Sequence, residues 1–485
     1  MLLPGPQYPP VAVALIPTNG KETADEIHQH HMRLLKMAAQ LNIKVIACSS
    51  DGAANELAAQ NLMDNEASIG EPLTYEAAEH GYILKVPVLN TGPMVSNQDP
   101  EHGRKTGRNQ PQHGTKTASL GEGFVVNHSL MELCEIPDSG MYRADVVNVD
   151  KQDDGAARRF YHPKALHACT EVVDGVCRVK DNFKGIFVYQ FILGKPRNIL
   201  MRTKIRSDFH FKGELFDAWM NRRLSVEDRV LAVVRARMFL NNWYHHIKSM
   251  SRTFPDLYSM TRSFISPASF NIFNRLCDTL IAHVIAYGKY YHNHPFCPWI
   301  MGTGFVEHFF GLSRSLLPDF SYAELLKMVK HIMLRQKLLL SGDFDDTRER
   351  KSRSGYILDY DASPLTEEEL LKARVTLTTI QINQLVDIGH READAICRDL
   401  LHMPVSKRGT PLIPLIGPAH WQGKKESKKQ GSGSDTDEDE AFEGDEEDGD
   451  EELLEEAEAA AEDVDEAGTA IEAARDAARY SELCE

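Results

Sequence analysis

A short apolar run that ends in a single acid constrains the fold of this chain more than any other feature. The residues from Ile43 to Ser50 have the pattern of a buried strand, and Asp51 and Gly52 follow as a turn signal. A carboxylate at the carboxyl end of a strand stands where the chain opens onto a cleft, and its oxygens suit a hard divalent cation. The alternative is an ordinary aspartate that caps the strand in a turn.

The N-terminal part of the chain alternates between two periodicities. Apolar runs at 11–16, 43–50 and 81–88 predict strands, and helical spacing at 21–41 and 53–63 predicts the helices between them. This order indicates an α/β fold, with helices packed on the faces of a sheet.

The pattern becomes mainly helical farther along the chain. One more β-rich stretch is predicted at 185–193, and long helices are predicted within 207–291. Further helices are predicted at 305–316, at 322–340, at 366–374 and at 380–402. Thr366 and Glu369 have the spacing of a capping box. After Met403, prolines at 404, 411, 414 and 418 indicate an extended linker.

The net charge of −17 has its origin in one segment. Residues 430–466 contain 20 acidic residues and no lysine or arginine, so the remainder of the chain has a net charge of about +3. Within this segment, 431–452 has too few apolar residues to fold, and we expect a disordered acidic tail there. Such a tail can bind basic partner proteins such as histones. Nucleic-acid binding by the folded part stays open.

Cysteine usage argues against a disulfide-bonded secreted protein, and hydropathy argues against a membrane-spanning one. The eight cysteines have no regular spacing and are interpreted as reduced intracellular thiols. His294 and Cys297 lie close together, but no second pair completes a zinc set. No apolar run reaches 18 residues, so neither a transmembrane helix nor a membrane partner is expected.

Two more segments carry acids next to histidines. The first, 99–109, begins with Asp99 and places His102 three residues later. The second, 306–314, places Glu307 at the start of a predicted helix. On physical grounds alone, His102 also fits a core histidine bonded to the backbone, and Glu307 also fits an acid that favours the helix macrodipole.

The first of these segments is also basic. Arg104, Lys105 and Arg108 follow His102 and are candidates for contacts with nucleic-acid phosphates. A plain solvated basic face is the alternative.

Asp51, the Asp-x-x-His pair of Asp99 and His102, and Glu307, in that order, resemble the RNase H-like transposases of eukaryotic cut-and-paste elements. The chain looks most similar to the P-element and THAP-type transposases and more distantly similar to the hAT group, over roughly residues 11–340. The resemblance implies an RNase H-like mixed, largely parallel sheet interrupted by a mainly helical insertion. It also implies that Asp51 and Glu307 are catalytic acids, with carboxylates within about 10 Å of each other and Mg²⁺ or Mn²⁺ between them.

One departure from the family pattern decides the functional expectation. Such transposases carry a first catalytic aspartate on the first strand, whereas here 11–16 looks like the third strand and no acid occurs before Glu22. The zinc-finger module of THAP-type proteins is missing as well. We therefore expect a degenerate or domesticated nuclear transposase that does not cleave DNA and for which DNA binding stays open. The alternative is a non-catalytic nuclear interaction protein whose acidic tail binds basic partners.

The same interpretation divides the chain into four parts. Residues 1–110 are expected to form the N-terminal half of the RNase H-like fold, and 111–300 the insertion. Helices in 301–403 are expected to complete the fold, and 404–485 to form the linker and the acidic tail.

Overall fold

The computed structural model describes the chain as two compact units. The described residues are 11–17, 20–112, 117–173, 176–194, 200–202, 208–210, 215–341 and 365–415. Unit 1 comprises 1–23, 299–364 and 445–485, and unit 2 comprises 24–298 and 365–444. The acidic segment 430–466 lies outside the described residues, so its predicted disorder stays a prediction.

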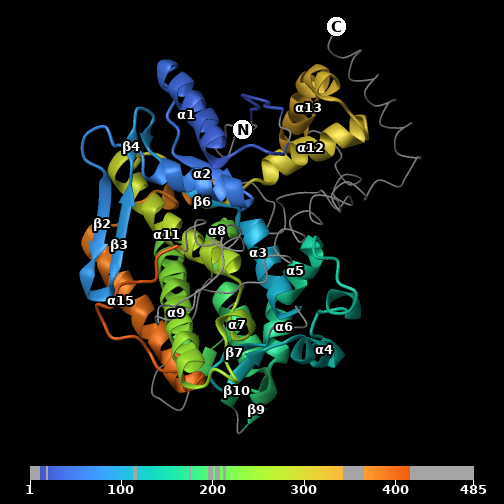
Figure 1. Cartoon of the computed structure of the whole chain (residues 1–485), viewed down its shortest axis with the longest axis vertical. Coiled ribbons are helices and arrows are strands. Elements are labelled where there is room, and N and C mark those ends of the chain that lie inside the picture. The colour runs from blue at the N-terminus through green and yellow to red at the C-terminus, as the bar shows by residue number, and fades with distance from the viewer. Residues whose placement is uncertain are drawn as a thin grey trace, which may run out of the picture. The chain divides into compact units, whose positions relative to one another are not determined.

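Unit 2 begins with the alternating elements that the sequence predicts. Helix α1 (Ala24–Gln40), strand β1 (Ala47–Ser50) and helix α2 (Ala54–Asp64) follow one another, and strand β6 (Val95–Gln98) leads into helix α3 (Pro100–Asn109). β1 and β6 pair in parallel, with Ala47 opposite Val95 and Ser50 opposite Gln98. This pairing places the ends of both strands next to the start of α3, which follows β6 along the chain (β6 and α3 in Figure 1).

The other described strands form antiparallel pairs. These are β2 (Leu73–Ala77) with β3 (Tyr82–Val86), β4 (Val88–Leu89) with β5 (Gly92–Pro93), β7 (Ala118–Leu120) with β8 (Gly123–Val125), β9 (Thr170–Val173) with β10 (Val176–Val179), and β11 (Leu200–Arg202) with β12 (Asp208–His210). The fold is therefore mixed α/β with small two-stranded sheets. Among the described strands the parallel pairing is confined to β1 and β6, so the expected larger parallel sheet is not described.

Short helices fill the middle of unit 2. They are α4 (Asn127–Glu135), α5 (Asp154–Phe160), α6 (Pro163–Ala168), α7 (Lys184–Leu193) and α8 (Leu215–Met220), with 3₁₀ turns η1 (Ala78–His80), η2 (Gln110–Gln112), η3 (Arg143–Asp145) and η4 (Asp181–Phe183). The predicted β-rich stretch at 185–193 is wrong, because these residues form α7. Every residue from Gly185 to Leu193 is buried, and a segment that is apolar on all sides has no period to separate helix from strand.

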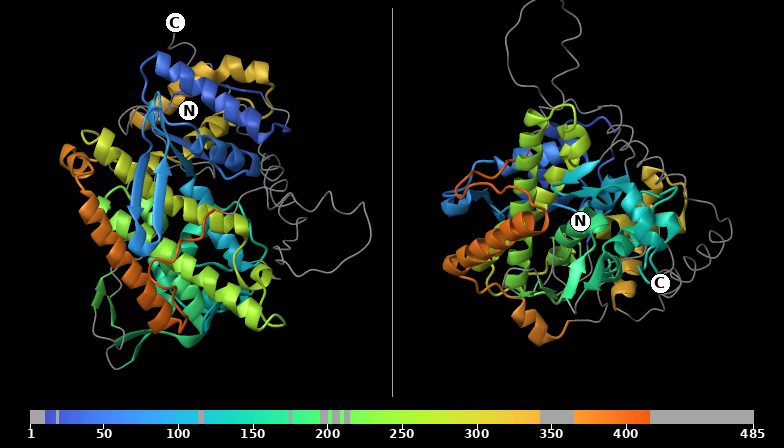
Figure 2. Two further views of the ribbon diagram at one scale, coloured as in Figure 1. Left: turned by 60° about the vertical axis from the view of Figure 1, so that its left-hand side comes forward. Right: turned by 90° about the horizontal axis from the view of Figure 1, so that it is seen from below.

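Three long helices form the core of unit 2. α9 (Val226–Thr253), α11 (Pro267–Tyr290) and α15 (Thr379–Ala395) pack together, with α15 lying along α9 (Figures 1 and 2). The short α10 (Met260–Ser263) joins the first two, and η5 (Pro298–Ile300) follows α11. The helical region predicted within 207–291 is confirmed, apart from the strand β12.

The chain returns to unit 2 after residue 364. Thr366 and Glu369 form the predicted capping box of α14 (Glu367–Lys372), and α15 continues into a π-helical turn, η7 (Ile396–Leu400). Residues 404–415 belong to the segment that the sequence predicts as an extended linker, and they make hydrogen bonds to α9. The amide of Ile413 donates to Oδ1 of Asn241 at 3.0 Å, and its carbonyl accepts from Arg237 at 2.6 Å. The segment is thus bonded along α9.

Unit 1 is built around two helices. α12 (Gly304–Leu316) and α13 (Tyr322–Ser341) confirm the predicted helices, and they share a core of Phe309, Leu312, Leu325 and Ile332. The predicted strand at 11–16 is not found among the described residues 11–17. Ala12 and Leu15 pack against this helical core. They are three residues apart, whereas in a strand every second residue would face the core.

The expected domain boundaries differ from the observed units. Residues 111–298 are mainly helical, as expected for an insertion, but they belong to the same unit as 24–110. Arg275 of α11 illustrates the connection, because it donates to the carbonyl of Ser96 in β6 and forms a 3.0 Å ion pair with Asp64 of α2.

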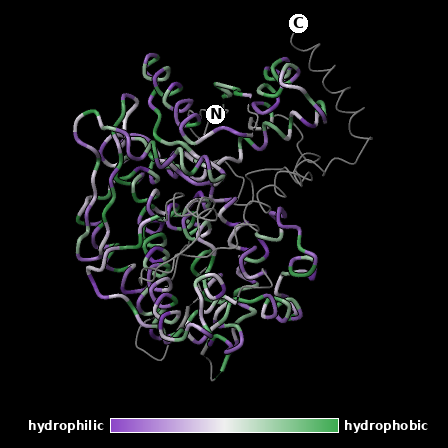
Figure 3. The backbone as a smooth tube through the Cα atoms, in the orientation of Figure 1, coloured by the Kyte–Doolittle hydropathy of each residue, from purple (hydrophilic) through white to green (hydrophobic). Residues whose placement is uncertain are grey.

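Hydrophilic and hydrophobic stretches both occur along the helical part of the backbone (Figure 3). Within the described ranges, none of the helices combines the length and the apolar character that crossing a membrane requires.

The contact of α15 with α9 generates a stability prediction. A Cβ added at Gly389 of α15 would lie 2.8 Å from Cγ1 of Val234, whereas one added at Gly288 of α11 would meet nothing nearer than 3.6 Å. We expect Gly389→Ala to lower the free energy of unfolding by about 1–3 kcal/mol through overpacking. Gly288→Ala should leave it unchanged or raise it by up to about 1 kcal/mol. Urea unfolding of both variants measures the difference, and equal stabilities would contradict the tight α9–α15 contact.

Candidate functional site at the ends of β1 and β6

The two parallel strands place two aspartates next to their paired ends. Ser50 is the last residue of β1 and Gln98 the last of β6, and the two are opposite each other. The amide of Asp99 donates to the carbonyl of Ser50 at 2.8 Å, which extends the pairing by one residue. Asp51 and Asp99 therefore directly follow neighbouring strand ends at the same edge of the sheet. The sequence analysis predicted this position at a strand end for Asp51.

Asp51 presents an exposed carboxylate at this edge. Its Oδ1 accepts from the amide of Ala53 at 3.2 Å, just before α2 begins. Gly52 between them has a φ of +105°, and a Cβ at this position would come within 3.2 Å of Oε1 of Gln98 and 3.8 Å of the ring of His102. Only glycine adopts this conformation readily, so the sequence Asp-Gly fixes the turn.

Asp99 has a different role from Asp51. Its side chain is 1% exposed and caps α3, where it accepts from the amide of Glu101 at 3.1 Å. His102 lies one turn into α3, half-buried and close to Gly52. The structure thus brings Asp51, Asp99 and His102 together, and among these three Asp51 is the exposed one.

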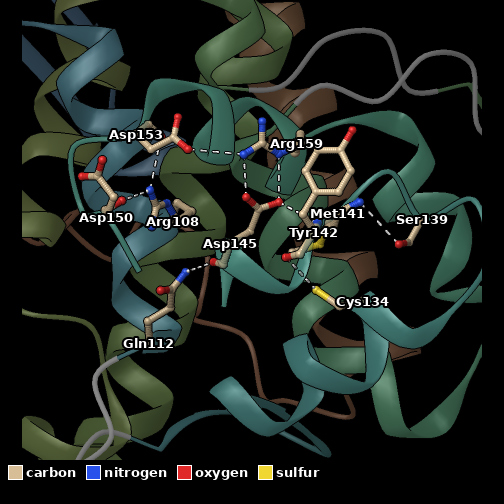
Figure 4. A network of polar contacts seen from close by, with 10 residues as sticks. All are labelled: Arg108, Gln112, Cys134, Ser139, Met141, Tyr142, Asp145, Asp150, Asp153 and Arg159. Carbon is tan, nitrogen blue, oxygen red and sulfur yellow. Dashed lines mark hydrogen bonds and ion pairs between the residues drawn. The ribbon is translucent and has the colours of Figure 1, made fainter. Parts of the chain in front are cut away.

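The three basic residues of α3, which the sequence analysis named as candidates for phosphate contacts, do not form an exposed basic face. Arg104 is 3% exposed and forms an ion pair with Glu101. Lys105 is largely covered and lies 3.6 Å from Asp154 of α5. Arg108 is fully buried, and its guanidinium donates to the carbonyls of Asp150 and Asp153 at 2.7 and 3.2 Å (Figure 4). A nucleic acid on the surface does not reach Arg104 or Arg108 in this arrangement.

Arg108 adjoins a polar network that sequence reasoning missed (Figure 4). The buried carboxylate of Asp145 accepts from Arg159 at 2.9 and 2.5 Å and from the amide of Tyr142 at 2.8 Å. Arg159 also reaches Asp153 at 3.3 Å. These bonds hold the loop before α5 against α3. The sequence analysis did not single out these residues, and the ion pairs of Arg159 with Asp145 and Asp153 have separations of 14 and 6 residues, which match neither a helical nor a strand neighbour.

A second polar network supports the strand ends from inside. Gln60 of α2 is fully buried and donates to the carbonyl of Asn97 at 2.8 Å, while its own Oε1 accepts from Gln98 at 2.7 Å. Nε2 of His283 in α11 lies 3.0 Å from Oδ1 of Asn97. Burial lowers the pKa of His283 to about 3, so this imidazole is neutral and serves as a hydrogen-bonding group.

A cluster of three titratable side chains lies on the other side of β1. Nε2 of His31 in α1 is 3.3 Å from Oε1 of Glu56 in α2, and Nδ1 of His31 is 4.0 Å from Sγ of Cys48 in β1. Burial, and then the charge of Asp51, raise the pKa of Glu56 to about 7. The sequence analysis treated Cys48 as an ordinary reduced thiol and did not single out His31 or Glu56.

Glu307, the other predicted catalytic acid, belongs to unit 1. It is exposed in the first turn of α12, where its amide donates to the carbonyl of Thr303 at 3.2 Å. The neighbouring His308 is buried, and burial lowers its pKa to about 3. Asp51 and Glu307 belong to different units, so the predicted distance of about 10 Å between their carboxylates stays a prediction.

The donor set at the strand ends fits a hard cation only in part. Asp51 supplies an exposed carboxylate of the kind that Mg²⁺ or Mn²⁺ prefers. The carboxylate of Asp99 already accepts a backbone hydrogen bond as a helix cap. A metal at this edge would therefore depend on Asp51 and on further acids from elsewhere in the chain.

The chain was also compared with known proteins. It matches no family model, no curated protein and no solved structure.

The cap formed by Asp99 is testable by two substitutions. We expect Asp99→Ala to lower the free energy of unfolding by about 0.5–2 kcal/mol, because the first turn of α3 loses its acceptor. Asp99→Asn keeps an accepting oxygen and should cost less. Guanidinium unfolding followed by circular dichroism measures both. An Asp99→Asn variant as unstable as Asp99→Ala would show that the charge of Asp99, rather than its role as a cap, matters for stability.

Proposed function

We propose that this chain is a transposase-derived protein with an RNase H-like core that binds DNA and does not cleave it. The parallel pairing of β1 and β6 is the observation that carries the proposal. This pairing agrees with the order of motifs in the sequence, because Asp51 directly follows β1 and the Asp99-x-x-His102 motif directly follows its parallel neighbour β6. Glu307 in the first turn of α12 agrees with the third motif. The proposed location is the nucleus.

The DNA-binding part of this proposal needs an exposed basic surface other than α3. Helix α13 offers one in Lys327, Lys330, His331 and Lys337, which are all exposed. Their positions fall within about a third of the helix circumference and along about 15 Å of its length. Glu324 is the acid of this helix and lies in its first turn, so the stripe itself is positively charged.

A stripe of this kind suits the phosphate backbone. Lysines that neutralise phosphates release counterions, so the affinity falls as salt rises and depends little on base sequence. The opposite face of α13 carries Leu325 and Ile332 in the core of unit 1. This packing fixes which side of the helix faces the solvent. We therefore assign the phosphate contacts to Lys327, Lys330 and Lys337.

Binding to a labelled DNA duplex tests this assignment. Lys327→Gln combined with Lys330→Gln should weaken the affinity at low salt and reduce the salt dependence by about one to two released counterions. Lys44→Gln combined with Lys85→Gln is the matched control, because both lysines are exposed in unit 2 and the change in net charge is the same. Fluorescence anisotropy across a salt series measures both. Equal losses in the two double variants would contradict a specific role for α13.

The absence of cleavage is tested on supercoiled plasmid. A two-metal site needs three acids, so a cation held by Asp51 and Glu307 alone would be under-coordinated and would activate water poorly. We expect the purified 485-residue chain to leave the plasmid intact with Mg²⁺ or with Mn²⁺. Robust nicking that depends on the metal and disappears in Asp51→Ala would show that the chain is an active nuclease.

A second candidate function rests on the acidic segment 430–466. Its 20 acidic residues, without a single lysine or arginine, favour a nuclear interaction protein that binds basic partners such as histones. The same segment can also compete with DNA for the α13 stripe as a tethered polyanion. If neither the full chain nor a chain ending at Lys429 binds DNA at low salt, the interaction protein is the better proposal.

A further inference from the structure

Three side chains from three elements meet at β1, the strand that Asp51 follows. His31 comes from α1, Cys48 from β1 and Glu56 from α2, and one potential ligand atom of each lies within 4.8 Å of the other two. All three side chains are half-buried. The sequence separations of 17 and 8 residues match no metal-binding motif, so the cluster exists only through the fold.

The elements that carry the cluster are firmly connected. α1 packs on α2, and β1 is hydrogen-bonded to β6 along its whole length. Gln60, one turn after Glu56 on α2, donates to the carbonyl of Cys48 at 3.3 Å. Because the backbones around Cys48 and Glu56 are tied together in this way, the two side chains stay close without a direct bond between them.

The donor types select among metal ions. An imidazole nitrogen, a thiol sulfur and a carboxylate oxygen form a set typical of zinc, whereas Mg²⁺ and Ca²⁺ take oxygen ligands almost exclusively. Ligand atoms around a tetrahedral zinc lie about 3.3–3.8 Å apart, given bond lengths of about 2.0–2.3 Å. Nε2 of His31 lies 3.3 Å from Oε1 of Glu56, whereas Nδ1 of the same ring lies 4.0 Å from Sγ of Cys48. Because an imidazole binds one zinc ion through one nitrogen, the side chains of His31 and Cys48 have to rotate before the three ligand atoms, which lie within 4.8 Å of one another, reach these distances.

We propose that His31, Cys48 and Glu56 form a zinc site with three protein ligands and a fourth position open to water or another ligand. The site is separate from the hard-cation site expected from Asp51 and Glu307, and it does not depend on the proposed function. A zinc ion at this site would join α1 and α2 to β1, the strand that ends just before Asp51. Burial raises the pKa of the Cys48 thiol to about 12, so zinc binding has to displace its proton.

Titration with Co²⁺ is the experiment that tests this site, because Co²⁺ takes the place of zinc and is coloured. The full chain, reduced and freed of metal, should bind one Co²⁺ with the near-ultraviolet absorption of a cobalt–thiolate bond, and Zn²⁺ should displace it. Cys48→Ser should abolish the thiolate absorption. His31→Gln and Glu56→Gln should keep the thiolate and weaken the binding of Co²⁺ by more than about tenfold.

Two control variants isolate the cluster. His28→Gln removes a neighbouring histidine of α1 that is paired with Glu66 at 2.8 Å, and Cys134→Ser removes a half-buried thiol of α4. Both should bind Co²⁺ as the unmodified chain does. Zn²⁺ should also raise the melting temperature of the unmodified chain and of both controls, but not that of Cys48→Ser.

Three results would overturn the proposal. These are a full chain without cobalt–thiolate absorption, an absorption that survives in Cys48→Ser, and a loss in Cys134→Ser as large as that in Cys48→Ser. None of these results bears on DNA binding by α13. Failure of the zinc site and failure of the proposed function are therefore distinguishable.

Discussion

The burial of helix α9 is the constraint on which the rest of unit 2 depends. This helix carries arginines and asparagines into the interior, and a buried polar group without a partner costs about 1–3 kcal/mol or more. Arg235 pairs with Glu392 of α15 at 2.8 Å, and Arg237 pairs with Asp278 of α11 at 3.1 Å. Asn242 donates to Asp394 of α15 at 3.1 Å. α11 and α15 are therefore each placed against α9 by specific polar partners as well as by apolar contact.

These partners also explain which parts of the fold the sequence could predict. Amphipathic helices such as α1, α12 and α13 were found because one face is apolar and the other polar. α7 was mistaken for a strand because its residues are buried all round. The strand predicted at 11–16 failed because Ala12 and Leu15 face the core of unit 1 at a helical rather than an alternating spacing. The pairing of strands into small sheets could not be predicted, because the residues of one short strand do not show which other strand it pairs with.

The candidate site was predictable to a similar degree. Asp51 at a strand end was visible in the sequence, because it is a local feature. Asp99 was singled out as part of a motif, but its role as the cap of α3 was not predicted. The burial of Arg108 was not, since its partners lie 42 and 45 residues away in the loop before α5. His31, Cys48 and Glu56 escaped notice for the same reason. Local chemistry can thus be inferred from sequence, whereas the surroundings of a charged side chain depend on contacts between distant segments.

The return of the chain to unit 2 has a consequence for its synthesis. α9 leaves the ribosome well before α15 and the segment 404–415 that cover it, because residues 299–364 of unit 1 lie between. At a rate of about 5–20 residues per second, residues 299–415 take about 5–25 s to emerge. During that interval Arg235 has no Glu392 to pair with, and the face of α9 around Val234, which Gly389 of α15 later covers, is open to solvent. Unit 2 therefore completes its fold only late in translation, and the nascent chain needs protection from aggregation until then.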